Sequence, residues 1–450
     1  MDSKLLPFAL QDVPRYTSYP TAVQFQADFP GKTADQWLTD LDPEAALSVY
    51  VHIPFCRQLC WYCGCHTSVP NTYDRAARYV DLLVRDIKRS ASLYGGRHGR
   101  VKHLHFGGGT PTYLDDMHIA EIVDAIDKGF GLASGGEVAL ESDPRTLTRE
   151  RARVLTGIGF NRISFGVQDF AMPVQMKINR VQTFGLVAAA TEYLRDAGFT
   201  SVNFDLMYGL PAQTTDSVIK TALQAAELKP DRIAVFGYAH VPWFKRHQKM
   251  IDDTDLPGVT ERYAQATAIE ATLCAEGYDA IGLDHFALSH DELSTAAQAG
   301  TLRRNFQGYT TDVADALLSF GASAIGEFRQ GFVQAARDTL QWSDAIERHE
   351  SPVIRGLATT PEDRMRSEII ERLMCDLAVD YGKIARAHGF NVSVLGDIVA
   401  KLEPVVMAGI ASHAGTRVSV QPQHRLFLRT VATAFDAHFV AAPNRHAKAV

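Results

Sequence analysis

Four of the six cysteines in this chain lie within ten residues of one another. They are Cys56, Cys60, Cys63 and Cys65, in the pattern C-x3-C-x2-C followed by one more cysteine after a glycine. Thiolates on one tight loop are the usual ligands of an iron–sulfur cluster. Three such ligands would leave one iron of a four-iron cluster without a protein ligand, and an open iron can bind and reduce another molecule. The run therefore favours an iron–sulfur site.

Other chemistries of clustered thiols remain open. A structural zinc site usually takes two separated ligand pairs, and no second C-x2-C or Cys/His pair follows in the chain. A disulfide framework belongs to exported proteins, but the first residues, MDSKLLPFALQD, lack the apolar core of an export signal. Inert or redox-active thiols are a third possibility. We expect the two remaining cysteines, Cys274 and Cys375, to be core residues of helices.

Composition restricts the class of protein. A net charge of −7 argues against a general nucleic-acid binder. Apolar windows such as 314–325 are shorter than a membrane span, and this one contains Asp315. We therefore expect a cytoplasmic protein in a reducing compartment, with neither nucleic acid nor membrane as a partner.

Strand and helix patterns alternate from residue 48 onward. The strands are expected at 48–53, 101–106, 137–141, 162–165, 201–206 and 232–236, and the helices at 75–91, 117–130, 148–158, 184–197 and 214–227. This alternation predicts an α/β fold with a parallel sheet. Six repeats are two short of a closed eight-fold barrel, so we expect an open three-quarter (β/α)6 barrel with a wide mouth. The cysteines follow the first strand, at the end where such folds collect functional groups.

Three regions are predicted around this alternation. Residues 1–47 are a Pro-rich, irregular N-terminal arm contacting the active site, 48–350 the catalytic barrel with an extension, and 365–450 a smaller, mostly helical domain after a linker at 350–365. The extension should hold a helix at 258–276, a strand at 278–283, a loop at 305–311 and a turn at 319–328. The last region should hold helices at 364–377, 381–387, 392–407 and 425–437 and a hairpin at 409–421.

The arm stretch PRYTSYPTA admits two interpretations. Its tyrosines could simply pack it on the surface, or the arm could close over a cavity and offer Arg15 to an anionic ligand. The first was the more economical interpretation of the sequence alone.

Polar or glycine-rich residues follow each expected strand. They are the loop HFGGGTPTY at 105–113, Glu141, Gln168, Arg180, Asp205, Ala239, His240 and His285. For any one of them a structural role is the simpler explanation; Glu141, for example, could pair with Arg145. A series at successive strand ends instead indicates a ligand site at the barrel mouth.

The combination of motifs resembles one family. PRYTSYPTA, YVHIPFC, C-G-C, GGGTPTYL, GVQDF, YAH, DHFA and NFQGYTT are similar to the motifs of oxygen-independent coproporphyrinogen III oxidases, which are radical S-adenosylmethionine (SAM) enzymes. The resemblance runs over nearly the whole chain. It implies a barrel of the radical SAM type with a smaller, mostly helical C-terminal domain.

The resemblance also implies the cofactors and their residues. One [4Fe–4S] cluster would be held by Cys56, Cys60 and Cys63, with Cys65 as a non-ligand beside a second SAM. Two SAM molecules would bind side by side. The first would contact Tyr50, Gly108, Glu141 and Ile325, and the second Tyr62, Gly109, Thr110, Gln168, Arg180, Asp205 and Ala239.

The implied reaction is a radical oxidative decarboxylation in anaerobic haem biosynthesis. A 5′-deoxyadenosyl radical would convert two propionates of coproporphyrinogen III to vinyl groups, giving protoporphyrinogen IX. The protein would act as a monomer with a low-potential electron donor such as flavodoxin or ferredoxin. Candidate cations for the substrate carboxylates are Arg15, Arg57, Arg303 and Arg304. Two alternatives are a haem-binding chaperone on the same barrel and a radical SAM enzyme acting on another tetrapyrrole.

Overall fold

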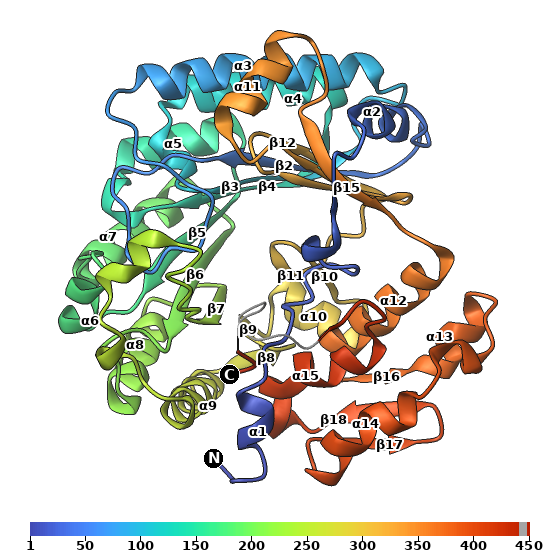
Figure 1. Cartoon of the computed structure of the whole chain (residues 1–450). Coiled ribbons are helices and arrows are strands. Elements are labelled where there is room, and N and C mark those ends of the chain that lie inside the picture. The colour runs from blue at the N-terminus through green and yellow to red at the C-terminus, as the bar shows by residue number, and fades with distance from the viewer. Residues whose placement is uncertain (441–447) are drawn as a thin grey trace.

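Six parallel strands, taken in chain order, form the centre of the molecule (Figure 1). In this computed structural model, which describes residues 1–440 and 448–450, they are β2 (Leu47–Ile53), β3 (Val101–Gly108), β4 (Leu132–Ser142), β5 (Arg162–Gln168), β6 (Ser201–Tyr208) and β7 (Arg232–Gly237). Each pairs in parallel with the next. The predicted open six-repeat barrel is confirmed.

A helix lies between each pair of these strands and covers the outer face of the sheet (Figure 1). The helices are α3 (Asp74–Leu93), α4 (Asp116–Phe130), α5 (Arg149–Ile158), α7 (Phe184–Ala197) and α8 (Thr215–Glu227), with a short extra helix, α6 (Met172–Lys177), before α7. Thr148 and Thr214 cap the N-termini of α5 and α8 with their side chains. Gly159 and Gly198 end α5 and α7 in the left-handed conformation.

Two extensions widen the sheet, and apart from β12 their strands pair antiparallel. Beyond β2 stand β12 (Ala316–Phe320), which is parallel to β2, and then β13 (Ile325–Phe328), β14 (Gly331–Ala335), β15 (Val353–Ala358) and β1 (Gln26–Ala27). Helix α11 (Thr339–Glu347) joins β14 to β15. Beyond β7 stand β9 (His285–Leu288) and β8 (Tyr278–Ile281), preceded by α9 (Val259–Ala275) and followed by α10 (Glu292–Ala299).

Several local predictions in these extensions were wrong. The expected linker at 350–365 contains β15, whose backbone pairs with both β14 and β1. The expected turn at 319–328 contains the end of β12 and all of β13. The expected loop at 305–311 belongs to a hairpin of β10 (Arg303–Asn305) and β11 (Gly308–Thr310). These strands are short and become stable only by pairing with distant segments, which local patterns do not reveal.

The C-terminal region is mostly helical, as predicted. It contains α12 (Pro361–Asp376), α13 (Tyr381–Ala387), α14 (Ile398–Met407) and α15 (Leu428–Ala432), and a small sheet of β16 (Ala378–Asp380), β17 (Ala411–Ala414) and β18 (Arg417–Val420). The hairpin expected at 409–421 is confirmed by β17 and β18. The helix expected at 392–407 is interrupted at Gly396, which has φ +65°. The final helix expected at 425–437 is reduced to α15 between two 3-10 turns.

The N-terminal arm joins two separate apolar cores. Leu5, Ala9, Tyr16 and Tyr19 pack with the C-terminal region, whereas residues 34–38 pack with the barrel. The arm is not wholly irregular, because it contains α1 (Leu6–Ala9) and α2 (Gly31–Thr39) as well as β1. In Figure 1 it runs across the barrel mouth from α1, which contacts α9, to α2, which contacts α3. Among the described residues no helix combines the length and apolar character needed to cross a membrane.

Candidate functional site

The carboxyl ends of the parallel strands surround a cavity of about 560 Å³. All four clustered cysteines line it, together with nine of the eleven residues that the resemblance assigns to SAM. These nine are Tyr62, Gly108, Gly109, Thr110, Glu141, Gln168, Arg180, Asp205 and Ala239. Residues from Cys56 to Ala239, far apart in the chain, therefore share one site.

The glycine-rich loop after β3 is bonded directly to the start of the cysteine loop. Gly109 donates its N–H to the carbonyl of Ile53 at 2.8 Å, and Thr110 donates to the carbonyl of Phe55 at 2.8 Å. A Cβ on Gly109 would lie 2.7 Å from the Phe55 carbonyl oxygen. This approach is possible only for glycine, and it fixes Cys56 against the loop.

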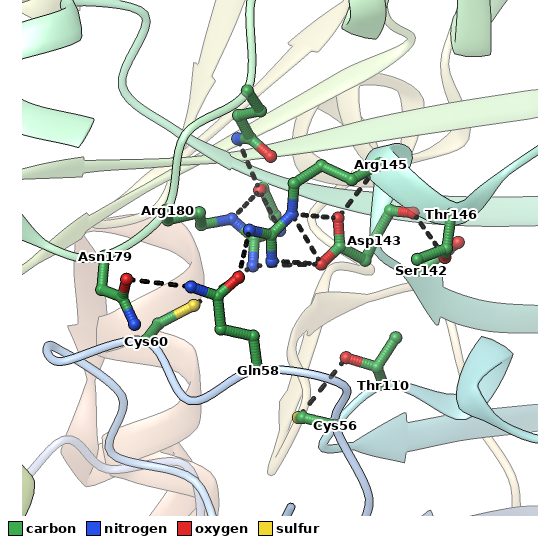
Figure 2. Close-up of polar contacts among 12 residues, drawn as sticks. Cys56, Gln58, Cys60, Thr110, Ser142, Asp143, Arg145, Thr146, Asn179 and Arg180 are labelled. Carbon is green, nitrogen blue, oxygen red and sulfur yellow. Dashed lines mark hydrogen bonds and ion pairs between the residues drawn. The ribbon is translucent and has the colours of Figure 1, made fainter. Parts of the chain in front are cut away.

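Cys56 is surrounded by hydroxyl groups. Its Sγ lies 3.1 Å from the Thr67 hydroxyl and accepts a hydrogen bond from Thr110 at 3.5 Å (Figure 2). Burial raises the pKa of the Cys56 thiol, and these hydroxyl groups oppose the increase. On the same loop the Cys63 thiol is hydrogen-bonded to Cys65. This bond outweighs the effect of burial and lowers the pKa of Cys63 to about 7.

The other side of the cysteine loop is bonded to the segment after β5. Asn179 donates to the Leu59 carbonyl at 2.9 Å, and Arg180 Nη1 lies 3.5 Å from Cys60 Sγ. Arg180 also donates from Nε and Nη2 to the Gly166 carbonyl, at 3.0 and 2.7 Å. Figure 2 shows its buried guanidinium between Cys60 and Asp143. Arg180 therefore links the cysteine loop to β5.

An ion pair that the sequence did not reveal holds this corner together. Arg145 Nη2 lies 2.6 Å from Asp143 Oδ2, and Arg180 Nη1 lies 3.6 Å from the same oxygen. Burial raises the pKa of Asp143, but the hydrogen bonds and charges of the two arginines outweigh burial and lower it. The suggested pairing of Arg145 with Glu141 was wrong, since Arg145 uses Asp143.

Glu141 instead faces the glycine loop. Its Oε2 accepts the N–H of Gly108 at 3.1 Å, and its Oε1 lies 3.7 Å from His105 Nε2. The ring of Tyr50 stacks on His105, so Tyr50 lies behind this carboxylate rather than in the cavity wall. Ile325 also lies outside the wall, on β13, where it pairs with Gln334.

The segment after β7 clamps the cysteine loop from the third side. Lys245 donates to the Cys65 carbonyl at 2.8 Å, His247 Nε2 lies 2.7 Å from the Cys63 carbonyl, and Gln248 donates to the Tyr62 carbonyl at 3.0 Å. Gln248 also donates to the Ala239 carbonyl at 3.3 Å. Nothing in the sequence pattern singled out these three residues, because each acts through a backbone carbonyl rather than a motif.

Asp205 and Gln168 complete the wall. The Asp205 carboxyl accepts a hydrogen bond from Ser164 at 3.2 Å, and burial and the nearby Glu141 charge raise its pKa to about 7. Gln168 has φ +68° at the end of β5, a conformation uncommon for residues other than glycine. Among the remaining candidates, His240 Nε2 lies 2.8 Å from Asp253 and His285 Nδ1 lies 2.8 Å from Asp284.

The two isolated cysteines differ in burial, and the candidate arginines line different cavities. Cys375 is buried as predicted, but Cys274 is exposed, so that prediction was wrong. Arg15 and Arg57 line the cavity. Arg303 lines a different cavity and pairs with Glu371 at 3.0 Å.

The donor set of the cavity fits the implied cofactors. Cys56 and Cys60 already accept hydrogen bonds from hydroxyl and guanidinium groups, an environment that suits thiolate ligands. No three His, Cys, Asp or Glu side chains of residues 1–440 and 448–450 converge on a point where a single metal ion would bind. Thiolates of a four-iron cluster bind different irons, so they need no such convergence. The glycine backbone beside Glu141 leaves space for a ligand.

Comparison with known proteins agrees with this site. Residues 50–225 match the model of the radical SAM superfamily. The oxygen-independent coproporphyrinogen III oxidase of Bradyrhizobium diazoefficiens is 44% identical over 97% of each chain, and that of Escherichia coli K12 is 38% identical over 94% of this chain and 93% of its own.

A solved structure gives the same answer for the fold. The coproporphyrinogen III oxidase of Escherichia coli, described as a radical SAM enzyme, superimposes with a TM-score of 0.90 at 37% identity, over 95% of this chain and 100% of that chain. Because these matches span nearly the whole chain, it belongs to the oxygen-independent coproporphyrinogen III oxidase family of radical SAM proteins.

Proposed function

We propose that this protein catalyses the oxygen-independent oxidative decarboxylation of coproporphyrinogen III to protoporphyrinogen IX in haem biosynthesis. The observation that carries the proposal is the single cavity shared by the cysteine loop and nine of the residues assigned to SAM. The names of full-length relatives at 37–44% identity support the choice of substrate.

Three cysteines would hold the cluster. Cys56 and Cys60 are fixed from opposite sides of the loop, by Thr110 and Arg180. The backbone of Cys63 is held by His247, which contacts its carbonyl, and that of Cys65 by Lys245. When bound, the cluster and SAM supply a 5′-deoxyadenosyl radical that removes a hydrogen atom from a propionate side chain. The protein's part is to hold these groups in register and away from water.

Carboxylates and the buried arginine would orient two SAM molecules. Glu141 and Gly108, with Tyr50 and Ile325 as outer neighbours, are proposed for the first. For the second, Arg180 would offer its guanidinium to a SAM carboxylate, and Asp205, Gln168 and Ala239 line the same cavity. The stoichiometry of two rests on the resemblance and on the separate positions of Glu141, near the end of β4, and Asp205, within β6.

We propose a separate role for each of the three regions predicted from the sequence. The arm of residues 1–47 contributes Arg15 to the cavity, residues 48–350 supply the catalytic barrel, and residues 365–450 pack against the arm. We further propose a cytoplasmic monomer that accepts electrons from a flavodoxin or ferredoxin. A reducing compartment would keep the cysteines as thiols.

An anaerobic assay tests this proposal. Reconstituted protein is mixed with SAM, a low-potential reductant and coproporphyrinogen III, and the products are separated by chromatography. The proposal requires deoxyadenosine, methionine and protoporphyrinogen IX. Haem binding without decarboxylation would indicate a chaperone instead, and S-adenosylhomocysteine would indicate a methyltransferase. Either outcome overturns it.

A further inference from the structure

A second cavity, of about 450 Å³, adjoins the cysteine site. The two cavities share Arg15 and the residues 236–239 at the end of β7. The second is enclosed by α9, the β10–β11 hairpin, α15 and the arm residues 12–17. A large ligand bound at the shared wall would therefore extend into both.

The second cavity carries more positive than negative side chains. Its lining contains five cations and three carboxylates; the cations are Arg15, Arg262, Arg304, Arg429 and Lys448, and the carboxylates are Asp12, Glu270 and Asp284. All three carboxylates already have cationic partners, because Asp12 lies 2.9 Å from Lys448, Glu270 lies 3.1 Å from Arg425, and Asp284 lies 4.0 Å from Arg304. In a chain of net charge −7, this local excess of arginine indicates an anionic ligand.

Arg262 is a cation without a carboxylate. Among the described residues its side chain makes no ion pair or hydrogen bond; the guanidinium lies 5.5 Å from the centre of the Tyr208 ring. Two glycines give it room, since a Cβ at Gly209 would collide with it and one at Gly237 would lie 3.2 Å from Nη2. Burial lowers its pKa. The chain thus builds a fitted place for an arginine and leaves its charge uncompensated beside the cavity.

Arg15 is the second such cation, and the arm that carries it is fixed by two other arginines. Arg304 donates to the backbone carbonyls of Arg15 and Tyr16, at 3.4 and 3.2 Å, and Arg429 donates to that of Val13 at 3.3 Å. No ion pair of the Arg15 side chain is formed within the described residues. Arg304 and Arg429 therefore hold the backbone, while the guanidinium of Arg15 stands where the two cavities meet.

We propose that Arg262 and Arg15 bind carboxylates of the tetrapyrrole that are not being transformed, and that Arg304 and Arg429 are positioning residues for the arm. The inference rests on the proposed function, because a porphyrinogen bearing four propionates is the anion concerned. If Arg262 and Arg15 bind two propionates in the second cavity, another propionate can extend past Phe236 and Ala239 into the cysteine site. A guanidinium suits this task because it binds a carboxylate with two parallel hydrogen bonds.

A binding titration tests the inference without turnover. Coproporphyrin III, the oxidised and fluorescent tetracarboxylate, is titrated in the dark into wild-type protein and into the variants Arg262→Gln and Arg15→Gln. Each variant should raise Kd about tenfold or more. The control is Arg78→Gln, which removes an arginine 71% exposed on the outer helix α3 and should bind as wild type does.

The ligand supplies a second control. Coproporphyrin III tetramethyl ester, in the same cosolvent, has no carboxylates, so wild type and the two variants should bind it equally. The inference is overturned if Arg262→Gln binds the free acid as tightly as wild type, or if the ester shows the same loss. Circular dichroism confirms that each variant is folded.

The positioning role has its own readout. Arg429→Gln should speed hydrogen exchange of the amides of residues 12–17, whereas Arg262→Gln should not; equal rates in both would contradict the role. Different results would refute the proposed function and the proposed carboxylate site. Wild type that makes no protoporphyrinogen IX while the arginines still control Kd would refute the function but support the carboxylate site. Normal turnover with unchanged KM in Arg262→Gln would do the reverse.

Discussion

The guanidinium of Arg180 lies within hydrogen-bonding distance of the Cys60 sulfur, with 3.5 Å between Nη1 and Sγ. These two residues are 120 positions apart in the chain, and one comes from the loop after β2 and the other from the segment after β5. The contact places the positive charge of a SAM-binding candidate directly beside a proposed cluster ligand. A change in the position of Arg180 would therefore affect both the proposed SAM site and the proposed cluster site.

Arg180→Lys should therefore damage SAM binding even though it keeps the charge. An ammonium cannot reproduce the two hydrogen bonds to the Gly166 carbonyl together with the contact to Cys60. We expect the Kd for SAM to rise about tenfold or more by isothermal titration, whereas Arg153→Lys, an exposed residue of α5, should be unchanged. A wild-type affinity in Arg180→Lys would remove Arg180 from the site.

Replacing single cysteines separates ligand from neighbour. Cys60→Ser should lose the cluster after anaerobic reconstitution, measured as iron per chain and as visible absorbance. Cys65→Ser should retain it, because Cys65 is assigned beside the second SAM rather than to iron. Equal loss of iron in both variants would contradict the ligand assignment.

Gly109→Ala should uncouple the glycine loop from the cysteine loop. The added Cβ would lie 2.7 Å from the Phe55 carbonyl oxygen, which is backbone and cannot rotate away. We expect a lower melting temperature and incomplete cluster incorporation. Gly185→Ala, on helix α7, is the matched control, since a Cβ there meets nothing within 4 Å. A reconstituted Gly109→Ala protein with normal iron content would show that this close approach is dispensable.

Gln248→Leu should destabilise the clamp on the cysteine loop. The side chain is buried and donates to the carbonyls of Tyr62 and Ala239 while accepting the N–H of Val241. Leaving these groups unpaired should cost about 2–4 kcal/mol in the free energy of unfolding. Gln298→Leu, at an exposed position of α10, should change it little. Urea denaturation of the cluster-free protein measures both, and equal costs would dismiss the clamp.

Asp205 should make stability depend on pH. Its pKa is raised to about 7 from an ordinary value of 3.8, so between about pH 4 and pH 7 the unfolded carboxyl loses its proton while the folded one keeps it. Stability conferred at low pH is therefore lost as pH rises through this window. Asp205→Asn stays neutral and should be more stable than wild type by about 1–3 kcal/mol at pH 8, and by almost nothing at pH 4.

Denaturation of the cluster-free protein across that pH range measures the difference. Ser164 donates to the Asp205 oxygen, and the Asn amide oxygen can accept the same bond, so the comparison isolates the charge. A difference that stays constant from pH 4 to pH 8 would contradict the raised pKa.

Much of this protein was determined by local sequence. The six barrel strands and the helices between them carry periodic apolar patterns and cap residues such as Thr148 and Thr214, which act over a few neighbouring positions. The cysteine spacing and the glycine loop likewise fix their own local geometry. The order of strands then follows from short right-handed connections, so the cavity at the carboxyl ends was foreseeable, and with it the shared position of Cys60, Glu141 and Asp205.

Only the tertiary structure decided how that cavity is closed. Strand β15 forms because β14 and β1 lie beside it. Arg145 pairs with Asp143 rather than with Glu141 because the 3-10 turn that follows Asp143 brings the two side chains together. The clamp by Lys245, His247 and Gln248 and the uncompensated charge of Arg262 depend on segments brought together from across the chain. Pairing, desolvation and charge compensation are properties of neighbours in space, so no window of sequence contains them.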